Sequence, residues 1–70
     1  MTIVDARGRS CPEPVILTKK AVEKTREPIQ VLVDNQVAVD NITRFVTNAG
    51  LHIQVTPAGE DFELLIRHGE

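Results

Sequence analysis

The chain has 70 residues, of which 41% are hydrophobic and 26% charged, and its length allows one domain over residues 1–70 with a single core. The net charge of −2 and the lack of Trp and Tyr argue against direct nucleic-acid binding, which favours a basic surface and aromatic stacking. No apolar run of about 18 residues could span a membrane and a single cysteine cannot form an internal disulfide, so we expect a monomer in the reducing cytoplasm, without membrane contact.

The first half of the chain alternates a strand pattern with a helix pattern. Residues 2–5 contain β-branched side chains and are followed by a loop with a glycine, which predicts a strand. A helix is expected over residues 12–26, because Pro12 is tolerated in a first helical turn. Pro28 would end this helix, since the residue before a proline disfavours the helical conformation. With these bounds Cys11 would be the N-cap residue.

The second half of the chain predicts three strands and one helix. Residues 29–33 are mostly β-branched, with Ile29, Val31 and Val33 on one face, and indicate a strand. Turn and cap residues then precede a helix over 36–49, which has one apolar stripe and a glycine directly after it. The alternation in 51–55 marks a half-buried strand, the segment 57–61 has the composition of a hairpin loop, and 62–66 complete the last strand.

The predicted order βαβαββ gives the fold class. Successive strand–helix–strand units connect through right-handed crossovers, which place both helices on the same face of the sheet. We therefore expect an α+β fold, a two-layer α/β sandwich with a mixed four-stranded sheet and two helices on one face. Leu32 and Leu65 would lie on the open face, either as isolated apolar residues or as part of a binding surface.

Cys11 is the candidate reactive residue. The thiolate is the nucleophilic form of cysteine, and a helix N-terminus favours an anion through its dipole and its free N–H groups. Pro12 and Pro14 remove two of those N–H groups and leave Glu13 and Val15 as the main donors. The prolines also fix the turn, so we expect the sulfur to point outward, where another protein can reach it.

Charges near Cys11 act in both directions. Arg7, Arg9 and Lys19 favour the thiolate, whereas Glu13 opposes it. Because the chain has no second cysteine, a Cys-x-x-Cys redox pair and a cysteine-rich zinc site are excluded. A persulfide on Cys11 would have no neighbouring thiol to react with. The alternative is that Cys11 is a half-buried cap residue without chemistry.

Other catalytic patterns are weak. His52 points outward on a predicted strand and His68 lies in the terminal tail, so neither is placed to pair with Cys11. We therefore expect neither a cysteine hydrolase nor a metal site.

The run "VDARGRSCPEPVILTKKAVE" resembles the signature of the TusA/SirA-like sulfurtransferases. In that signature an aspartate and Arg-Gly precede Cys-Pro-x-Pro, and a lysine-rich amphipathic helix follows. The residues that match are Asp5, Arg7, Gly8, Cys11, Pro12, Pro14, Lys19 and Lys20. The length and the order βαβαββ fit this family over essentially the whole chain. The run "VDNQVAVDNITRFVTNAG" further resembles the N-terminal domain of the YedF-like branch, which is linked to selenium metabolism.

The resemblance implies a sulfur carrier without a cofactor. Cys11 would accept sulfane sulfur as a persulfide from a donor such as a cysteine desulfurase or a rhodanese-like protein, and would pass it to an acceptor protein. The residues expected to shape the site are Arg7, Gly8, Arg9, Pro12, Glu13 and Pro14, and those expected to contact a partner are Ile16, Lys19 and Lys20. Arg9 stands where the family usually has an apolar residue, which bears on the choice of partner.

Two questions stay open at this point. Whether a persulfide carrier of this kind acts as an enzyme is not decided by the residues. The alternative function is a non-catalytic interaction or regulatory module that uses the open sheet face at Leu32 and Leu65.

Overall fold

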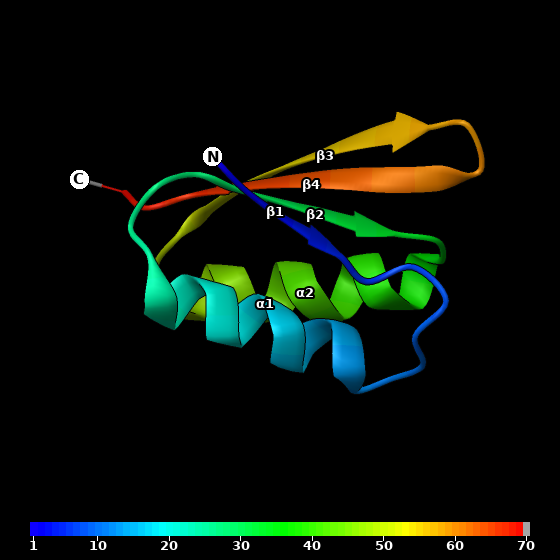
Figure 1. The fold of residues 1–70 in the computed structure, drawn as a ribbon, viewed down its shortest axis with the longest axis horizontal. Coiled ribbons are helices and arrows are strands. Elements are labelled where there is room, and N and C mark those ends of the chain that lie inside the picture. The colour runs from blue at the N-terminus through cyan, green and yellow to red at the C-terminus, as the bar shows by residue number, and fades with distance from the viewer. Residues whose placement is uncertain (70) are drawn as a thin grey trace.

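The computed structural model describes residues 1–69, which form four strands and two helices (Figure 1). In chain order the elements are β1 (Thr2–Asp5), α1 (Glu13–Lys24), β2 (Ile29–Val33), α2 (Gln36–Asn48), β3 (His52–Ala58) and β4 (Asp61–Arg67). The predicted order βαβαββ is confirmed.

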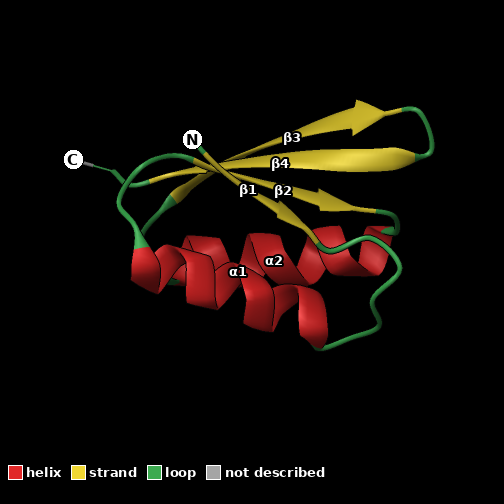
Figure 2. Cartoon of the chain, viewed as in Figure 1, coloured by secondary structure: helices red, strands yellow, loops and turns green. Residues whose placement is uncertain are grey.

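The strands form one mixed sheet in the order β1-β2-β4-β3. β1 and β2 are parallel, whereas β4 is antiparallel to both β2 and β3. Both helices lie on one face of this sheet, with α1 against β1 and β2 and α2 against β3 and β4 (Figures 1 and 2). The predicted two-layer sandwich is therefore confirmed. Because β1 and β2 are parallel neighbours, their carboxyl ends lie side by side. The loops that lead into α1 and α2 therefore start at the same end of the sheet.

The core lies between the sheet and the helices and is aliphatic. Every second residue of β2 is buried, as the prediction that Ile29, Val31 and Val33 share one face implies. The large apolar side chains that are fully buried are Ile29, Val31, Val33, Ile42, Val46, Leu64 and Ile66. Burial of a side chain of this size contributes roughly 1.5–3 kcal/mol to the free energy of unfolding. Ile42 and Val46 fix α2 on the sheet and thereby set which of its faces turns toward α1.

The start of α1 differs from the prediction. Its first residue is Glu13, and Pro12 takes the N-cap position without a side-chain hydrogen bond. The Glu13 backbone N–H donates to the Ser10 carbonyl oxygen at 2.9 Å, so the chain makes a turn before the helix begins. The prediction that Cys11 is the N-cap is wrong, because Cys11 lies within this turn. The helix also ends early, at Lys24, because the next residue is extended.

The hairpin between β3 and β4 is tighter than predicted. Pro57 and Ala58 belong to β3 and not to the loop, which leaves Gly59 and Glu60 as the turn. Two features permit this. β3 is an edge strand, where a proline leaves no hydrogen bond of the sheet unmade, and Gly59 adopts a φ of 67°, which a two-residue hairpin turn requires.

The open face of the sheet carries Leu32 and Leu65, as predicted, and both are half-buried. Their cross-strand neighbours are polar: Gln30 and Gln54 beside Leu65, and Asp5 and Glu63 beside Leu32. Leu32 is the diagonal neighbour of Leu65 and of the exposed Ile3, but charged and amide side chains directly oppose both leucines, so the apolar area of this face is small and interrupted.

Candidate functional site

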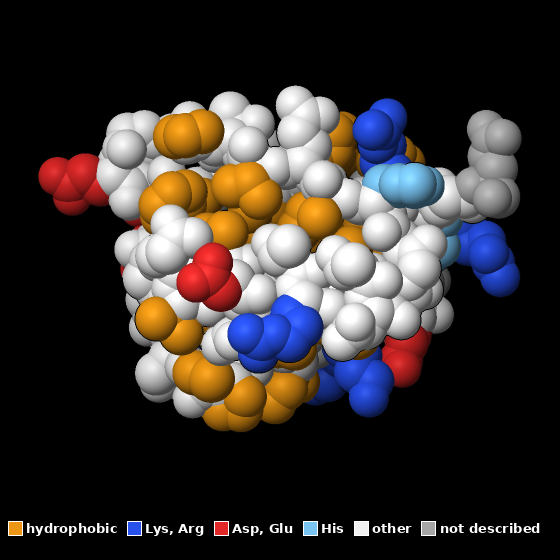
Figure 3. All heavy atoms as spheres, turned by 180° about the vertical axis from the view of Figure 1, so that it is seen from behind, with side chains coloured by type: hydrophobic (Ala, Val, Ile, Leu, Met, Phe, Trp, Pro, Cys, Tyr) orange, Lys and Arg blue, Asp and Glu red, His pale blue; other side chains and the backbone are white. Residues whose placement is uncertain are grey.

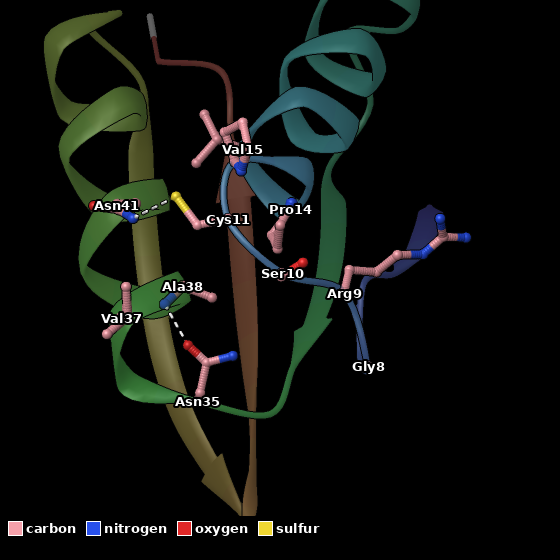
Figure 4. Close-up of a pocket in the computed structure, with 11 residues that line it drawn as sticks. Gly8, Arg9, Ser10, Cys11, Pro14, Val15, Asn35, Val37, Ala38 and Asn41 are labelled. Atoms are coloured by element: carbon pink, nitrogen blue, oxygen red, sulfur yellow. Dashed lines mark hydrogen bonds between the residues drawn. The ribbon is translucent and has the colours of Figure 1, made fainter.

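A cleft of about 380 Å³ lies between the start of α1 and the start of α2 (Figure 4). Its walls come from the loop after β1, from the first turn of α1 and from the first two turns of α2. The residues that line it are Gly8, Arg9, Ser10, Cys11, Pro12, Pro14, Val15, Asn35, Val37, Ala38 and Asn41. The parallel pairing of β1 with β2 is what brings these two helix starts together.

Cys11 is an exposed, free thiol in this cleft. Its side chain points across the cleft toward α2, and the sulfur lies beside Asn41 (Figure 4). The Asn41 Nδ2 donates to Cys11 Sγ at 3.7 Å, a distance suited to the large sulfur atom. The reacting atom of a thiol is therefore open to solvent on one side and contacts a hydrogen-bond donor on the other.

The N–H groups at the start of α1 do not contact the sulfur. The Glu13 N–H donates to the Ser10 carbonyl oxygen at 2.9 Å, and the Val15 N–H donates to the Pro12 carbonyl oxygen at 3.1 Å. Prolines have no N–H to offer. The expectation that Glu13 and Val15 serve as donors to Cys11 is therefore wrong, because the turn before the helix and the helix itself already use both groups.

The loop that carries Cys11 is tied to the loop before α2. The Gly8 N–H donates to Asp34 Oδ2 at 2.7 Å. This hydrogen bond, together with one from the Asn35 side chain, lowers the pKa of Asp34 below its ordinary value. Gly8 has a φ of 75°, a backbone conformation that favours glycine. Asp34 thus holds the loop of Cys11 against the start of α2.

Arg7 is held away from the cleft by two carboxylates. Its guanidinium contacts Asp5 at 2.9 Å and Asp61 at 3.4 Å. The Arg7 side chain, and then its backbone N–H, lowers the pKa of Asp5 to about 2, and Asp5 in turn raises the pKa of Arg7. Arg7 is therefore an anchor of the loop, and its charge is balanced by its neighbours.

Arg9 lines the cleft, but its side chain extends away from Cys11 (Figure 4). Its Nη1 donates to Glu13 Oε2 at 2.7 Å, and both side chains are about half exposed. The positive charge expected to favour a thiolate is thus paired with the negative charge expected to oppose it.

The structure brings together most of the residues predicted to shape the site. Gly8, Arg9, Pro12 and Pro14 line the cleft with Cys11. Arg7 and Glu13 lie outside the lining, where they hold the loop through ion pairs. The residues predicted to contact a partner are exposed on α1 but do not line the cleft: Ile16, Lys19 and Lys20.

The lining residues that were not predicted as site residues are Ser10 and Val15, beside the motif, and four from the start of α2: Asn35, Val37, Ala38 and Asn41. The topology offered a signal for those of α2, because two adjacent parallel strands place their following helices side by side. Val37 is 60% exposed at the cleft. Apolar side chains also gather on the rear face, at the end of the molecule (Figure 3) where α1 and α2 begin (Figure 1).

The histidines do not contribute to this cleft. His52 and His68 line a separate hollow with Arg67 and Gly69. Within residues 1–69, no three side chains of His, Cys, Asp or Glu gather closely enough to hold a metal ion. Neither helix described over residues 1–69 has the length and hydrophobicity needed to cross a membrane.

Comparison with known proteins gives consistent matches over the whole fold. The family model described as "Sulfurtransferase TusA" matches residues 2–68. A protein of Methanocaldococcus jannaschii described as a "putative sulfur carrier protein" is 36% identical, and the match covers 96% of this chain and 93% of that protein. The crystal structure of a SirA-like protein from Desulfitobacterium hafniense superposes with a TM-score of 0.87 at 32% identity, covering 100% of both chains.

Proposed function

Because the chain belongs to the TusA sulfurtransferase family, we propose that Cys11 carries sulfane sulfur as a persulfide from a donor protein to an acceptor protein. The observation that carries this proposal is the single free thiol, exposed in a cleft between two helix starts. A carrier needs a nucleophilic sulfur that two different proteins can reach in turn.

The chemistry consists of two successive exchanges at one sulfur. In the first, the Cys11 thiolate attacks the outer sulfur of a persulfide on the donor, and the donor cysteine leaves as a thiolate. In the second, a thiolate of the acceptor attacks the outer sulfur on Cys11. No second cysteine is present to attack the persulfide from within the chain, so the cargo persists until a partner arrives.

The shape of the site supports exchange between proteins more than catalysis on a small substrate. The thiol is exposed, and the loop that presents it is fixed by Gly8, Asp34 and Arg7. Exposed apolar area at Val37 and Ile16 lies on the two helices that flank the cleft, and such area is typical of protein contacts. We propose a cysteine desulfurase or a rhodanese-like protein as the donor, acting in the cytoplasm.

The test is sulfur loading followed by intact mass measurement. The purified protein is incubated with a cysteine desulfurase and free cysteine, and the expected result is the addition of one sulfur atom to the wild type. Cys11→Ser changes only the sulfur atom and should gain none. Failure of the wild type to gain sulfur, or equal loading of Cys11→Ser, would contradict the proposal.

The same experiment, repeated with selenocysteine, distinguishes sulfur from selenium as the cargo. The likeness of residues 33–50 to the YedF-like branch makes selenium the second candidate. Supplying the desulfurase with selenocysteine would add a heavier atom, and selective retention of that atom would assign this chain to selenium.

A further inference from the structure

Within residues 1–69, one hydrogen bond to the Cys11 sulfur is found, and it comes from α2 and not from the helix that Cys11 precedes. The donor is the side-chain amide of Asn41, at 3.7 Å from Sγ. We propose that Asn41 stabilises the negative charge on Cys11 Sγ when the sulfur cargo departs. The role of Asn41 in delivery rests on the proposed function, whereas its effect on the thiolate does not.

The N–H groups at the start of α1 do not stabilise a negative charge on the Cys11 sulfur. Pro12 and Pro14 have no N–H group, and the N–H groups of Glu13 and Val15 donate to backbone oxygens. Arg9 is the one charged side chain that lines the cleft, and it pairs with Glu13. Asn41 is the side chain that the structure shows donating to Sγ.

The cap and the buried face of α2 fix the position of Asn41. α2 begins at Asn35, whose Oδ1 accepts from the Ala38 N–H at 2.8 Å. Ile42, the neighbour of Asn41, is fully buried in the core. Val37 and Ala38 lie one turn before Asn41 on the same helix face and add apolar wall beside the donor.

The amide acts on the delivery step as follows. The thiolate of the acceptor attacks the outer sulfur, and a new bond joins those two sulfur atoms. The bond between Cys11 Sγ and the outer sulfur breaks, and its electron pair remains on Sγ as a thiolate. A proton on the outer sulfur travels with it, so no oxidant or reductant is required. The Asn41 amide contacts the atom on which the charge appears, and a better-stabilised thiolate leaves faster.

The same hydrogen bond has an opposite effect on the intrinsic nucleophilicity of Cys11. A stabilised thiolate is more abundant at neutral pH but less nucleophilic once the thiol is fully ionised. Removal of the donor should therefore slow the reaction of Cys11 at neutral pH and leave it unchanged or faster at alkaline pH. A general loosening of the site would not produce this opposite pair of changes.

The test compares variants in their reaction with a neutral dipyridyl disulfide. Asn41→Leu keeps the branched shape in a somewhat larger side chain and removes the donor, and Asn41→Asp keeps the shape and places a carboxylate beside the sulfur. Asn48→Leu makes the same change at the exposed last residue of α2 and serves as the matched control. Thermal unfolding of each variant establishes that it is folded.

For Asn41→Leu the ratio of the alkaline rate to the neutral rate should rise about threefold to tenfold, as loss of one solvent-exposed hydrogen bond implies. The rise should be larger for Asn41→Asp, and the ratio for Asn48→Leu should equal that of the wild type. Unchanged ratios in folded Asn41→Leu and Asn41→Asp would overturn the proposal.

A second measurement separates the role in delivery from the carrier function. Persulfide is placed on Cys11 chemically, and its single-turnover transfer to a small thiol is followed by mass. Transfer from Asn41→Leu should be slower than from Asn48→Leu by about twofold to threefold, because Sγ carries only part of its final charge in the transition state. Equal transfer would overturn the delivery role alone. Failure of desulfurase loading in the wild type would instead remove the carrier function and leave the effect of Asn41 on the thiolate standing.

Discussion

The two helices begin at the same end of the sheet, beyond the carboxyl ends of β1 and β2, but they differ in how their first N–H groups are capped. α2 has a side-chain cap, in which Asn35 Oδ1 accepts from the Ala38 N–H at 2.8 Å. α1 has none: Pro12 takes the cap position, and the turn before it carries an exposed thiol. The capped helix supplies a fixed wall with an amide donor, and the uncapped one supplies the reactive atom. The reactive residue, Cys11, thus precedes one helix, and the donor to its sulfur, Asn41, lies on the other.

The loop before α1 is tied to the loop before α2 at Gly8, whose N–H donates to Asp34. Gly8→Ala should lower the free energy of unfolding by roughly 1–2 kcal/mol, because a φ of 75° is strained for any residue with a Cβ. No atom obstructs the added methyl group, so the loss reflects backbone strain alone. Urea unfolding measures it. A variant as stable as the wild type would show that this loop relaxes freely.

The cap of α2 gives the next largest effect. Asn35→Ala should cost about 1 kcal/mol of unfolding free energy, because the Ala38 N–H loses its acceptor. Ser10→Ala is the matched change ahead of α1, where the interaction with the helix uses the Ser10 carbonyl oxygen. It should leave the unfolding midpoint nearly unchanged. Equal losses of unfolding free energy in the two variants would contradict the conclusion that only α2 has a side-chain cap.

Acid should lower the stability of the loops before α1 and α2, because Asp5 and Asp34 hold these loops as carboxylates. Arg7 lowers the pKa of Asp5 from 3.8 to about 2, and the Gly8 N–H lowers that of Asp34. A group with a depressed folded pKa contributes stability above its unfolded value and loses it as the pH falls through its folded value. Stability should therefore decline between about pH 4 and pH 2. Thermal melts of Asp5→Asn over this range should decline less steeply than those of the wild type, and an identical slope would contradict the assignment.

Local patterns were enough to predict the fold. The shared face of the β-branched residues in β2 and the apolar stripe of α2 predicted the buried residues, such as Val31 and Ile42, because the side chains on one face recur with a fixed period. The bounds of α1 and of the hairpin were less accurate. Pro12 permits a first helical turn but does not require one, and Pro57 is compatible with an edge strand as well as a loop.

The candidate site was predicted in part. Cys11 and its prolines are adjacent in sequence, so the motif itself indicates them. The contacts of Asp34 with Gly8 and of Asn41 with Cys11 join loops and helices far apart in the chain, and no local pattern encodes such pairs. They follow from the parallel pairing of β1 with β2, which only the assembled sheet makes explicit.

The most direct measurement of the carrier function localises the cargo. After loading by a cysteine desulfurase, the wild type is digested without reductant, and the peptide that contains Cys11 is analysed by tandem mass spectrometry. The added sulfur should reside on Cys11 and should disappear when a thiol acceptor is supplied before digestion. Sulfur found on any other residue, or sulfur on Cys11 that no thiol removes, would contradict the account.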